Sequence, residues 1–328
     1  MKKAIWKKTG SILLAAALAA GMLAGCGNAG DLDATVMTVN GEEVSNAEYR
    51  YYFNSLKTNV DAGDDSYWQE NEDQIVGLKT AAANYILQTF AVRALAEQEG
   101  ISLTEGDQEA LDNTMESMET QYGDKDALDA ALEENNLTEE VFRKNLEDNL
   151  LNQKLFDHLY GDQIMEQVSD DTWFCAKHIL IQYDDANAET HDEELGAAQN
   201  LLERARNGED FDQLIADYGE DPGMTQQPDG YYFDLNGNTP DGGSLVEEFY
   251  KGTQALEINE ISEPIATDYG YHIIKRVPLD MDYIEQNRTS FATTEMNEEY
   301  AGLLNDQMQQ LKIDYADIYS KITYDTYQ

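Results

Sequence analysis

Two short apolar runs constrain the fold of this chain more than any other feature, one at 176–181 and the other at 269–276. Each is rich in β-branched and aromatic residues, which is typical of a β-strand. Each also carries a histidine, His178 in the first and His272 in the second, although the chain has only four histidines. We therefore expect two strands of one domain that bring these histidines toward each other.

Several spaced motifs lie in a fixed order across this stretch. They read AKHILI at 176–181, FDQLIADYGEDPG at 211–223, DGYYF at 229–233, LVEEFY at 245–250 and ISEPIATDYGYHIIKRV at 261–277. Together they resemble the parvulin family of peptidyl-prolyl cis/trans isomerases over roughly 173–280. With its flanking segments, the complete chain resembles the extracytoplasmic foldase lipoproteins that carry one parvulin domain.

The resemblance implies an α+β fold, a parvulin-like antiparallel sheet with surrounding helices, inserted into a mainly α-helical chaperone domain. The elements expected within it are strands at 176–183, 229–233, 264–267 and 270–277, and helices at about 190–207, 211–217 and 244–251. The hairpin around Tyr269-Gly270 would direct His272 back toward His178.

The implied chemistry needs no covalent step. Rotation about a peptide bond faces a barrier of about 18–20 kcal/mol, and X-Pro bonds exchange slowly enough to limit folding. A catalyst must bind the twisted bond better than either planar form. This requires an apolar slot for the proline ring and a polar wall near the carbonyl group.

By resemblance, four residues occupy catalytic positions: His178, Asp221, His272 and Thr267. The histidines would be paired, Thr267 would hydrogen-bond one ring, and the Asp221 carboxylate would act electrostatically on the carbonyl group. The alternatives are that both histidines only pin the sheet and that Asp221 only caps its Asp-Pro turn.

The proline pocket would consist of Phe233, Leu245 and Phe249, which alternatively are plain core residues.

The chain departs from the family at Gln227-Pro228, where a glycine pair is usual, and in its long loop after Phe233. The basic cluster of phosphate-specific parvulins is also missing, since residues 173–280 hold six Lys/Arg against 23 Asp/Glu. The expected substrate is a neutral or basic X-Pro segment of an unfolded exported polypeptide.

The N-terminus has the pattern of a targeting signal. A basic segment ends at Lys8, an apolar run follows from Ile12 to Ala24, and the next residues include Leu23-Ala24-Gly25-Cys26. The pattern resembles a lipoprotein signal cleaved before Cys26, whose lipidation would bind the protein to a membrane. The alternative is an ordinary secretory signal with a chance cysteine.

Charge and cysteine content exclude several function classes. The net charge is −44 and becomes more negative without the signal lysines, so nucleic-acid binding is excluded. Cys175 is three residues from His178, on the opposite face of a strand, and is expected to be a buried apolar residue. No His/Cys/Asp set has metal-ligand spacing, and the chemistry requires no cofactor.

The flanking segments are expected to form the chaperone module. A hairpin over 35–44 turns at Asn40-Gly41, Ser45 caps the next helix, and another helix ends near Gly100. A helix at 283–310 and a strand at 313–315 close the chain. The resemblance implies apolar grooves that hold unfolded chains; the alternative is that the apolar stripes only pack together. His158 and His191 are expected to be solvated.

These observations predict a lipoprotein signal peptide at 1–25, a tether at 26–33, an N-terminal helical chaperone module at 34–172, a parvulin-type isomerase domain at 173–280 and a C-terminal helix packing with the N-terminal module at 281–328. The predicted function is that of a lipid-anchored extracytoplasmic foldase with isomerase activity. The alternative is a holdase whose parvulin-like domain is weak or inactive. The sequence leaves a homodimer open.

Overall fold

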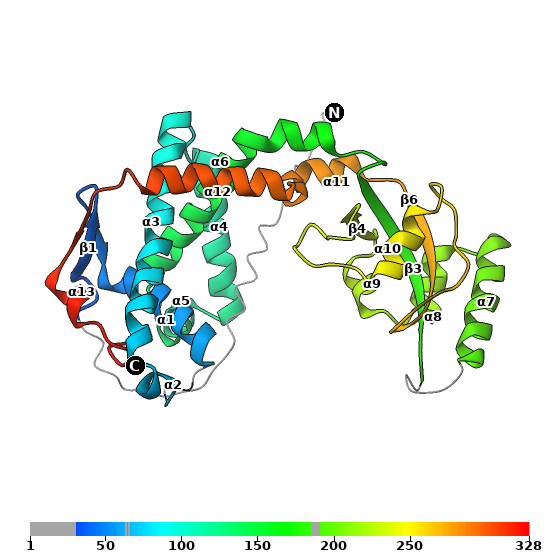
Figure 1. Ribbon diagram of the computed structural model, residues 1–328, viewed down its shortest axis with the longest axis horizontal. Helices are drawn as coiled ribbons and strands as arrows, with labels where there is room; N and C mark the ends of the chain where they lie inside the picture. The colour runs from blue at the N-terminus through cyan, green and yellow to red at the C-terminus, as the bar shows by residue number, and fades with distance from the viewer. Residues whose placement is uncertain (1–30, 63, 65, 185–190, 328) are drawn as a thin grey trace. The chain divides into compact units, whose positions relative to one another are not determined.

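The computed structural model describes residues 31–328 apart from 63, 65, 185–190 and 328. Its described residues form two compact units (Figure 1), one comprising 160–293 and the other comprising the remainder on both sides of it. The predicted signal peptide, Cys26 and most of the tether lie outside the described residues. In the described part of the chain, no helix has both the length and the apolar character needed to cross a membrane.

The flanking unit contains a three-stranded antiparallel sheet of β1 (Thr35–Val39), β2 (Glu42–Ser45) and β7 (Ile313–Tyr315), in the order β2-β1-β7. Asn40 and Gly41 have φ of 53° and 89°, as a type I′ turn requires. The predicted hairpin and closing strand are confirmed. Because β7 pairs with β1, the C-terminal segment completes a sheet that the N-terminal segment begins.

The helices of this unit pack around two apolar clusters. They are α1 (Asn46–Asp61), α2 (Ser66–Glu70), η1 (Glu72–Gln74), α3 (Ile75–Glu99), α4 (Glu105–Tyr122), α5 (Lys125–Glu134), α12 (Thr294–Met308), α13 (Asp317–Lys321) and most of α6 (Glu139–Gln167). Ser45 Oγ accepts a hydrogen bond from the amide of Glu48 at the start of α1. Gly100, with φ of 71°, ends α3 in the left-handed conformation. Both local signals were therefore interpreted correctly.

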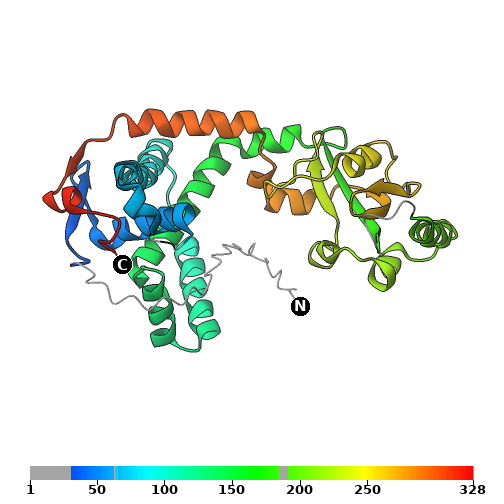
Figure 2. The same cartoon turned by 60° about the horizontal axis from the view of Figure 1, so that its bottom comes forward.

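The C-terminal helix is shorter than predicted. Residues 283–310 were expected to form one helix, but they divide into α11 (Met281–Gln286), η2 (Arg288–Phe291) and α12. Phe291 is 1% exposed and its ring centroid lies 4.7 Å from that of Trp173, so this contact holds η2 in the 160–293 unit. α12 packs against α3 and crosses it, as Figure 1 and Figure 2 both show.

The 160–293 unit is built on a four-stranded antiparallel sheet in the order β4-β3-β6-β5. Its strands are β3 (Trp173–Gln182), β4 (Tyr231–Asp234), β5 (Ile265–Thr267) and β6 (Gly270–Val277), and its remaining helices are α7 (Asp192–Arg206), α8 (Phe211–Tyr218), α9 (Pro222–Gln226) and α10 (Glu247–Gln254). The predicted order of elements is confirmed, and α9 is an addition where an acidic turn was expected.

Alternate residues of the central strands face two separate cores. Ile179 and Ile273 pack with α7 and α8 on one face of the sheet. Ala176 and Ile274 pack with Phe249 of α10 on the other face. His178 and His272 have the same parity as this second set, so the alternation places both histidines on the α10 face.

Candidate active site

The pairing of β3 with β6 brings the two histidines together. His178 lies opposite Ile274, and His272 lies opposite Leu180, two residues away on the same face. Such diagonal neighbours are within reach of aromatic side chains, and the centroids of the two histidine rings are 5.0 Å apart. Both residues are at least 95% buried.

Asp221 is placed beside the first histidine by the start of α9, which it N-caps. Its Oδ1 accepts a hydrogen bond from the Gly223 amide at 3.0 Å, and its Oδ2 accepts one from the Tyr231 hydroxyl at 2.8 Å. The same Oδ2 is 3.1 Å from His178 Nε2, although that nitrogen is not aligned for a hydrogen bond. Asp221 therefore caps its turn and also faces a buried histidine, so the two sequence interpretations are compatible.

This environment favours the ionised form of Asp221. The neighbouring His178 is the largest cause, and the hydrogen bonds from Tyr231 and Gly223 add to it; together they outweigh partial burial and lower the pKa of Asp221 to about 2. A carboxylate that accepts several hydrogen bonds keeps its negative charge across the neutral range. The site therefore presents a fixed anion next to the histidine pair.

The second histidine is held by Thr267 of β5. Thr267 Oγ1 is 2.9 Å from His272 Nε2 and accepts a hydrogen bond from the Tyr269 amide at 3.1 Å. Burial, with a smaller contribution from His178, lowers the pKa of His272 to about 3. His272 is therefore a neutral imidazole at neutral pH, and Thr267 fixes the orientation of its ring.

The apolar side of the site is formed by Phe249 of α10. Its ring stands edge-on to both histidine rings, with centroid distances of 5.0 Å to His178 and 5.5 Å to His272. Phe233 is fully buried behind it, 6.4 Å away between ring centroids, whereas Leu245 is only partly buried. Both phenylalanines are buried, and what distinguishes Phe249 is its contact with both histidine rings; the pocket formed by Phe233, Leu245 and Phe249 stays a prediction.

Tyr231 is a member of the cluster that sequence reasoning missed. Besides its hydrogen bond to Asp221, its ring is stacked on that of His178, with centroids 5.7 Å apart and planes at 28°. The signal was its position two residues before Phe233, which places both side chains on one face of β4. Sequence alone gave no reason to connect that face with Asp221.

Two other predictions concern side chains near this cluster. Cys175 is buried, as predicted, and burial raises the pKa of its thiol to about 12. The prediction that His191 is solvated is wrong. Its ring is stacked on that of Tyr183 at 3.7 Å between centroids, because the start of α7 lies against the end of β3.

In the described part of the chain, no group of three or more His, Cys, Asp or Glu residues could hold a metal ion.

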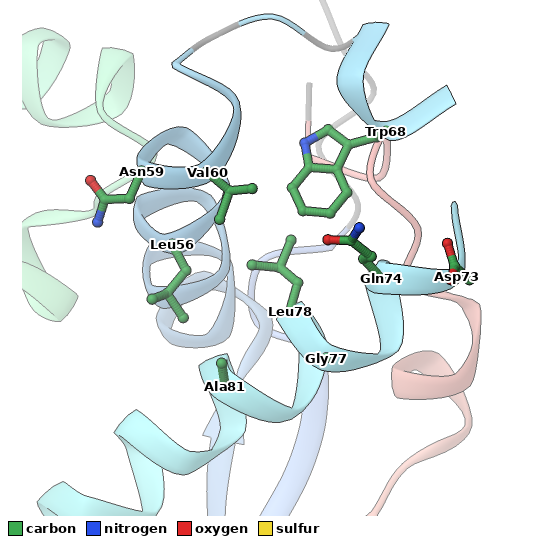
Figure 3. A pocket seen from close by; sticks show the side chains of 9 residues that line it. All are labelled: Leu56, Asn59, Val60, Trp68, Asp73, Gln74, Gly77, Leu78 and Ala81. Carbon is green, nitrogen blue, oxygen red and sulfur yellow. The ribbon is translucent and has the colours of Figure 1, made fainter. Parts of the chain in front are cut away.

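A concave surface lies in the other unit, between α1, α2 and the start of α3. It has a volume of about 520 Å³. Figure 3 shows Val60, Trp68 and Leu78 directed into the same space. Val60 is half exposed at its edge, whereas Trp68 is buried and donates its indole N–H to Asp61 at 2.6 Å. This is an open apolar pocket with an anchored aromatic wall.

Comparison with known proteins agrees with both units. Residues 162–277 match the model of the PPIC-type PPIase domain, and residues 1–156 match that of the SurA-like N-terminal domain. The foldase protein PrsA of Halalkalibacterium halodurans is 28% identical over 271 residues, which cover 80% of this chain and 71% of that protein. The chain therefore carries a parvulin-type isomerase domain and a SurA-like N-terminal domain.

Other foldases of this kind match over most of their length. The foldase protein PrsA of Caldanaerobacter subterraneus is 24% identical over 282 residues, which cover 84% of both chains. The crystal structure of the foldase protein PrsA from Streptococcus pneumoniae covers 78% of this chain and 93% of its own, with 18% identity and a TM-score of 0.39.

The Gln227-Pro228 pair, predicted to depart from the family pattern, lies next to the site. Gln227 ends α9, and Gly230 follows with φ of 116°. A Cβ at Gly230 would lie 2.8 Å from Cys175 Sγ, so glycine is required where the chain enters β4 against β3. The unusual Gln227-Pro228 pair thus leads into a tightly fixed entry to β4, which places Tyr231 beside Asp221.

Proposed function

We propose that this parvulin-type foldase acts as a lipid-anchored extracytoplasmic enzyme that isomerises X-Pro bonds in exported polypeptides. The observation that carries this proposal is the cluster of His178, His272, Asp221 and Phe249, which puts a fixed anion, a buried neutral imidazole and the edge of an aromatic ring in one place. No residue of the cluster has to form a covalent bond.

The proposed mechanism follows from amide resonance. In the planar bond the carbonyl oxygen carries partial negative charge, and this charge falls as the bond twists and resonance is lost. A carboxylate near the oxygen disfavours the planar form more than the twisted form. Asp221 is held ionised, so it supplies this difference in binding, which lowers the barrier.

The apolar part of the site would position the proline. Phe249 presents its ring to the space beside both histidines, and Leu245 is partly buried next to it in the same cluster. Apolar contact holds the proline ring while the preceding carbonyl group rotates. Thr267 keeps the His272 ring in one orientation, so the polar wall does not have to reorganise during rotation.

The test is the cis-to-trans isomerisation rate of short X-Pro peptides with the full-length chain. Asp221→Asn should lower kcat/KM by about 100- to 1,000-fold, the effect expected from removing a preorganised electrostatic group. Asp212→Asn is the matched control, because Asp212 is a largely exposed aspartate of the same unit, paired with Lys177. Equal activity in both variants would contradict the assigned role of Asp221.

A second candidate function, the holding of unfolded chains, is favoured by the pocket in Figure 3. Val60→Asn should weaken suppression of aggregation of an unfolded secreted protein by the full-length chain, because Val60 lines the pocket and is half exposed. Val76→Asn is the matched control, since Val76 is 67% exposed on α3 and is not part of the lining. Unchanged suppression by both variants would exclude this pocket as a holding site.

Membrane attachment through Cys26 is part of the proposal. It is supported by the basic segment, the apolar run and the Leu23-Ala24-Gly25-Cys26 sequence. Each buried CH₂ group of an acyl chain contributes about 0.8 kcal/mol, and stable attachment takes more than one chain. A diacylglycerol group on Cys26 would meet this requirement and would keep the isomerase at the membrane surface where exported chains emerge.

A further inference from the structure

The Asp221 carboxylate is held from two sides, and only one of them belongs to its own turn. The Gly223 amide donates to Oδ1, as expected for a helix N-cap. The Tyr231 hydroxyl donates to Oδ2 from a different element, β4. A capping aspartate does not need this second donor, so Tyr231 requires a separate explanation.

Gly223 leaves the space in which the Tyr231 hydroxyl lies. A Cβ built on Gly223 would be 1.8 Å from Tyr231 Oη, with the next atoms at 3.1 Å (Tyr231 Cζ) and 3.3 Å (Asp221 Oδ1). The backbone of Gly223 has no positive φ, so an alanine is conformationally allowed there. Its side chain would overlap the phenol oxygen and would also crowd Tyr231 Cζ and Asp221 Oδ1, which makes residues 223 and 231 interdependent.

Tyr231 is also in contact with the histidine that Asp221 faces. Its ring is stacked on His178, and its hydroxyl reaches the same Oδ2 that lies 3.1 Å from His178 Nε2. Burial, with the adjacent Asp221 adding to it, raises the pKa of the Tyr231 hydroxyl. The phenol therefore stays protonated and acts only as a donor.

We propose that Tyr231 is a positioning residue that fixes the Asp221 carboxylate against His178, and that Gly223 is the partner that makes room for it. This inference rests on the proposed isomerase function. Tyr231 does not act on the substrate bond itself. It sets the direction in which the carboxylate points and keeps it ionised, and through its ring it holds the plane of His178.

The first test is the pH profile of kcat/KM for X-Pro isomerisation in the full-length Tyr231→Phe variant. The Tyr231 hydrogen bond is one of the causes that lower the pKa of Asp221, so its loss should move the acid limb of the profile up by about one pH unit. If Tyr231 only contributed to packing, Tyr231→Phe would lower kcat/KM by the same factor at every pH and would leave the acid limb at the same pH. An unmoved acid limb would overturn the proposal.

Tyr232→Phe is the matched control. Tyr232 is the next residue of β4 and is buried, whereas Tyr231 is partly buried; the substitution removes the same hydroxyl group, but the Tyr232 side chain lies on the opposite face beside Cys175 and Tyr283. Its acid limb should coincide with that of the parent protein. A shift of the same size in this control would show that Tyr231 has no special relation to Asp221.

The second test is a double-mutant cycle between residues 223 and 231. Gly223→Ala should lower kcat/KM about tenfold in the parent, because it displaces a hydrogen bond to a charged group, and by less than about twofold in the Tyr231→Phe background. Gly196→Ala in α7, where a Cβ meets nothing within 4 Å, should have no effect. Additive effects of the two substitutions would overturn the interdependence.

A third readout separates this inference from the proposed function. The Asp221 carboxyl group can be titrated directly by NMR in full-length protein labelled at aspartate 13Cγ, with its signal assigned through Asp221→Asn. The pKa of Asp221 should be higher in Tyr231→Phe than in the parent and unchanged in Tyr232→Phe. If the parent does not isomerise X-Pro peptides but the pKa of Asp221 is higher in Tyr231→Phe, the isomerase proposal fails and the positioning role of Tyr231 stands. If the pKa of Asp221 is the same in both proteins, the positioning role fails, whether or not the parent is an active isomerase.

Discussion

Gly270 is the residue on which the geometry of the two histidines depends most. It begins β6, pairs with Gln182 of β3, and has φ of 150°. A Cβ at this position would lie 2.1 Å from the carbonyl oxygen of Ile181 and 2.8 Å from Gln182 Cα. These are backbone atoms of the neighbouring strand, so they cannot turn aside as a side chain would.

The cost of Gly270→Ala can be estimated from this geometry. The Cβ must retreat by about 1 Å to reach a permitted distance of about 3 Å, and this separates the end of β6 from β3. Loss of two ladder hydrogen bonds at about 1 kcal/mol each, with backbone strain of about 1 kcal/mol, gives about 3 kcal/mol. His272 follows two residues later, so the spacing between His272 and His178 should also change and isomerase activity should fall.

Gly208→Ala provides the matched control. Gly208 has φ of 93°, and a Cβ there meets nothing within 4 Å. An alanine at this position has the same kind of backbone strain as Gly270→Ala but no steric clash. Gly208→Ala should therefore lower the free energy of unfolding by about 1 kcal/mol. Hydrogen exchange of the β3 and β6 amides, which reports the opening free energy of this unit alone, measures both variants. Equal losses in the two variants would refute the steric argument.

Two further predictions follow from the site and one from the N-terminal sequence. The folded pKa of Asp221 is about 2, below its ordinary value of about 3.9, so its ionisation stabilises the fold above pH 4 and this contribution is lost as the pH falls toward 2. Asp221→Asn should therefore lower the free energy of unfolding by about 1–2 kcal/mol at pH 6. In urea titrations at lower pH, the difference in this free energy between the variant and the parent should shrink and vanish near pH 2. Phe249→Ala and Phe211→Ala each remove a buried ring and should each cost about 3–5 kcal/mol, but only Phe249→Ala should also raise KM for X-Pro peptides measured where both variants are folded. Cys26→Ser should move the protein from the membrane fraction to the soluble extracytoplasmic fraction on cell fractionation, and retention in the membrane would exclude anchoring through this thiol.

Local signals in the sequence predicted most of the elements correctly. The bounds of β6 agree with the predicted strand at 270–277, and the Asn40-Gly41 turn and the Gly100 helix end are as expected. These features depend on side-chain alternation and on the φ preference of a few residues. Such information is present in a window of a few residues, so a single sequence is sufficient to find it.

The features that were missed depend on short elements or distant contacts. α9 has only five residues, too few for a periodic pattern, although Asp221-Pro222 is a recognisable N-cap and first-turn pair. The break between α11 and α12 depends on Phe291 packing against Trp173, 118 positions earlier in the chain. The hydrogen bond from Tyr231 to Asp221 also joins separate elements. None of these contacts can be inferred from the residues next to them.

The same limit applies to the candidate site. The histidines, Asp221 and Thr267 were named through family resemblance, and the structure brings them into one cluster. The sequence did not distinguish Phe249, which faces both histidines, from Phe233, which is fully buried behind it. Both are apolar residues at suitable spacing, and only the packing of α10 on the sheet separates their roles.

The most direct test of the isomerase account is exchange NMR of an X-Pro peptide in the presence of the full-length chain, since it observes binding and interconversion in one experiment. Exchange cross-peaks between the cis and trans forms should appear with the parent protein. They should be lost with His272→Ala, while line broadening shows that the peptide still binds. Peptide binding by the folded parent without any exchange cross-peaks would contradict the account and would identify the protein as a chaperone that uses a parvulin fold only for binding.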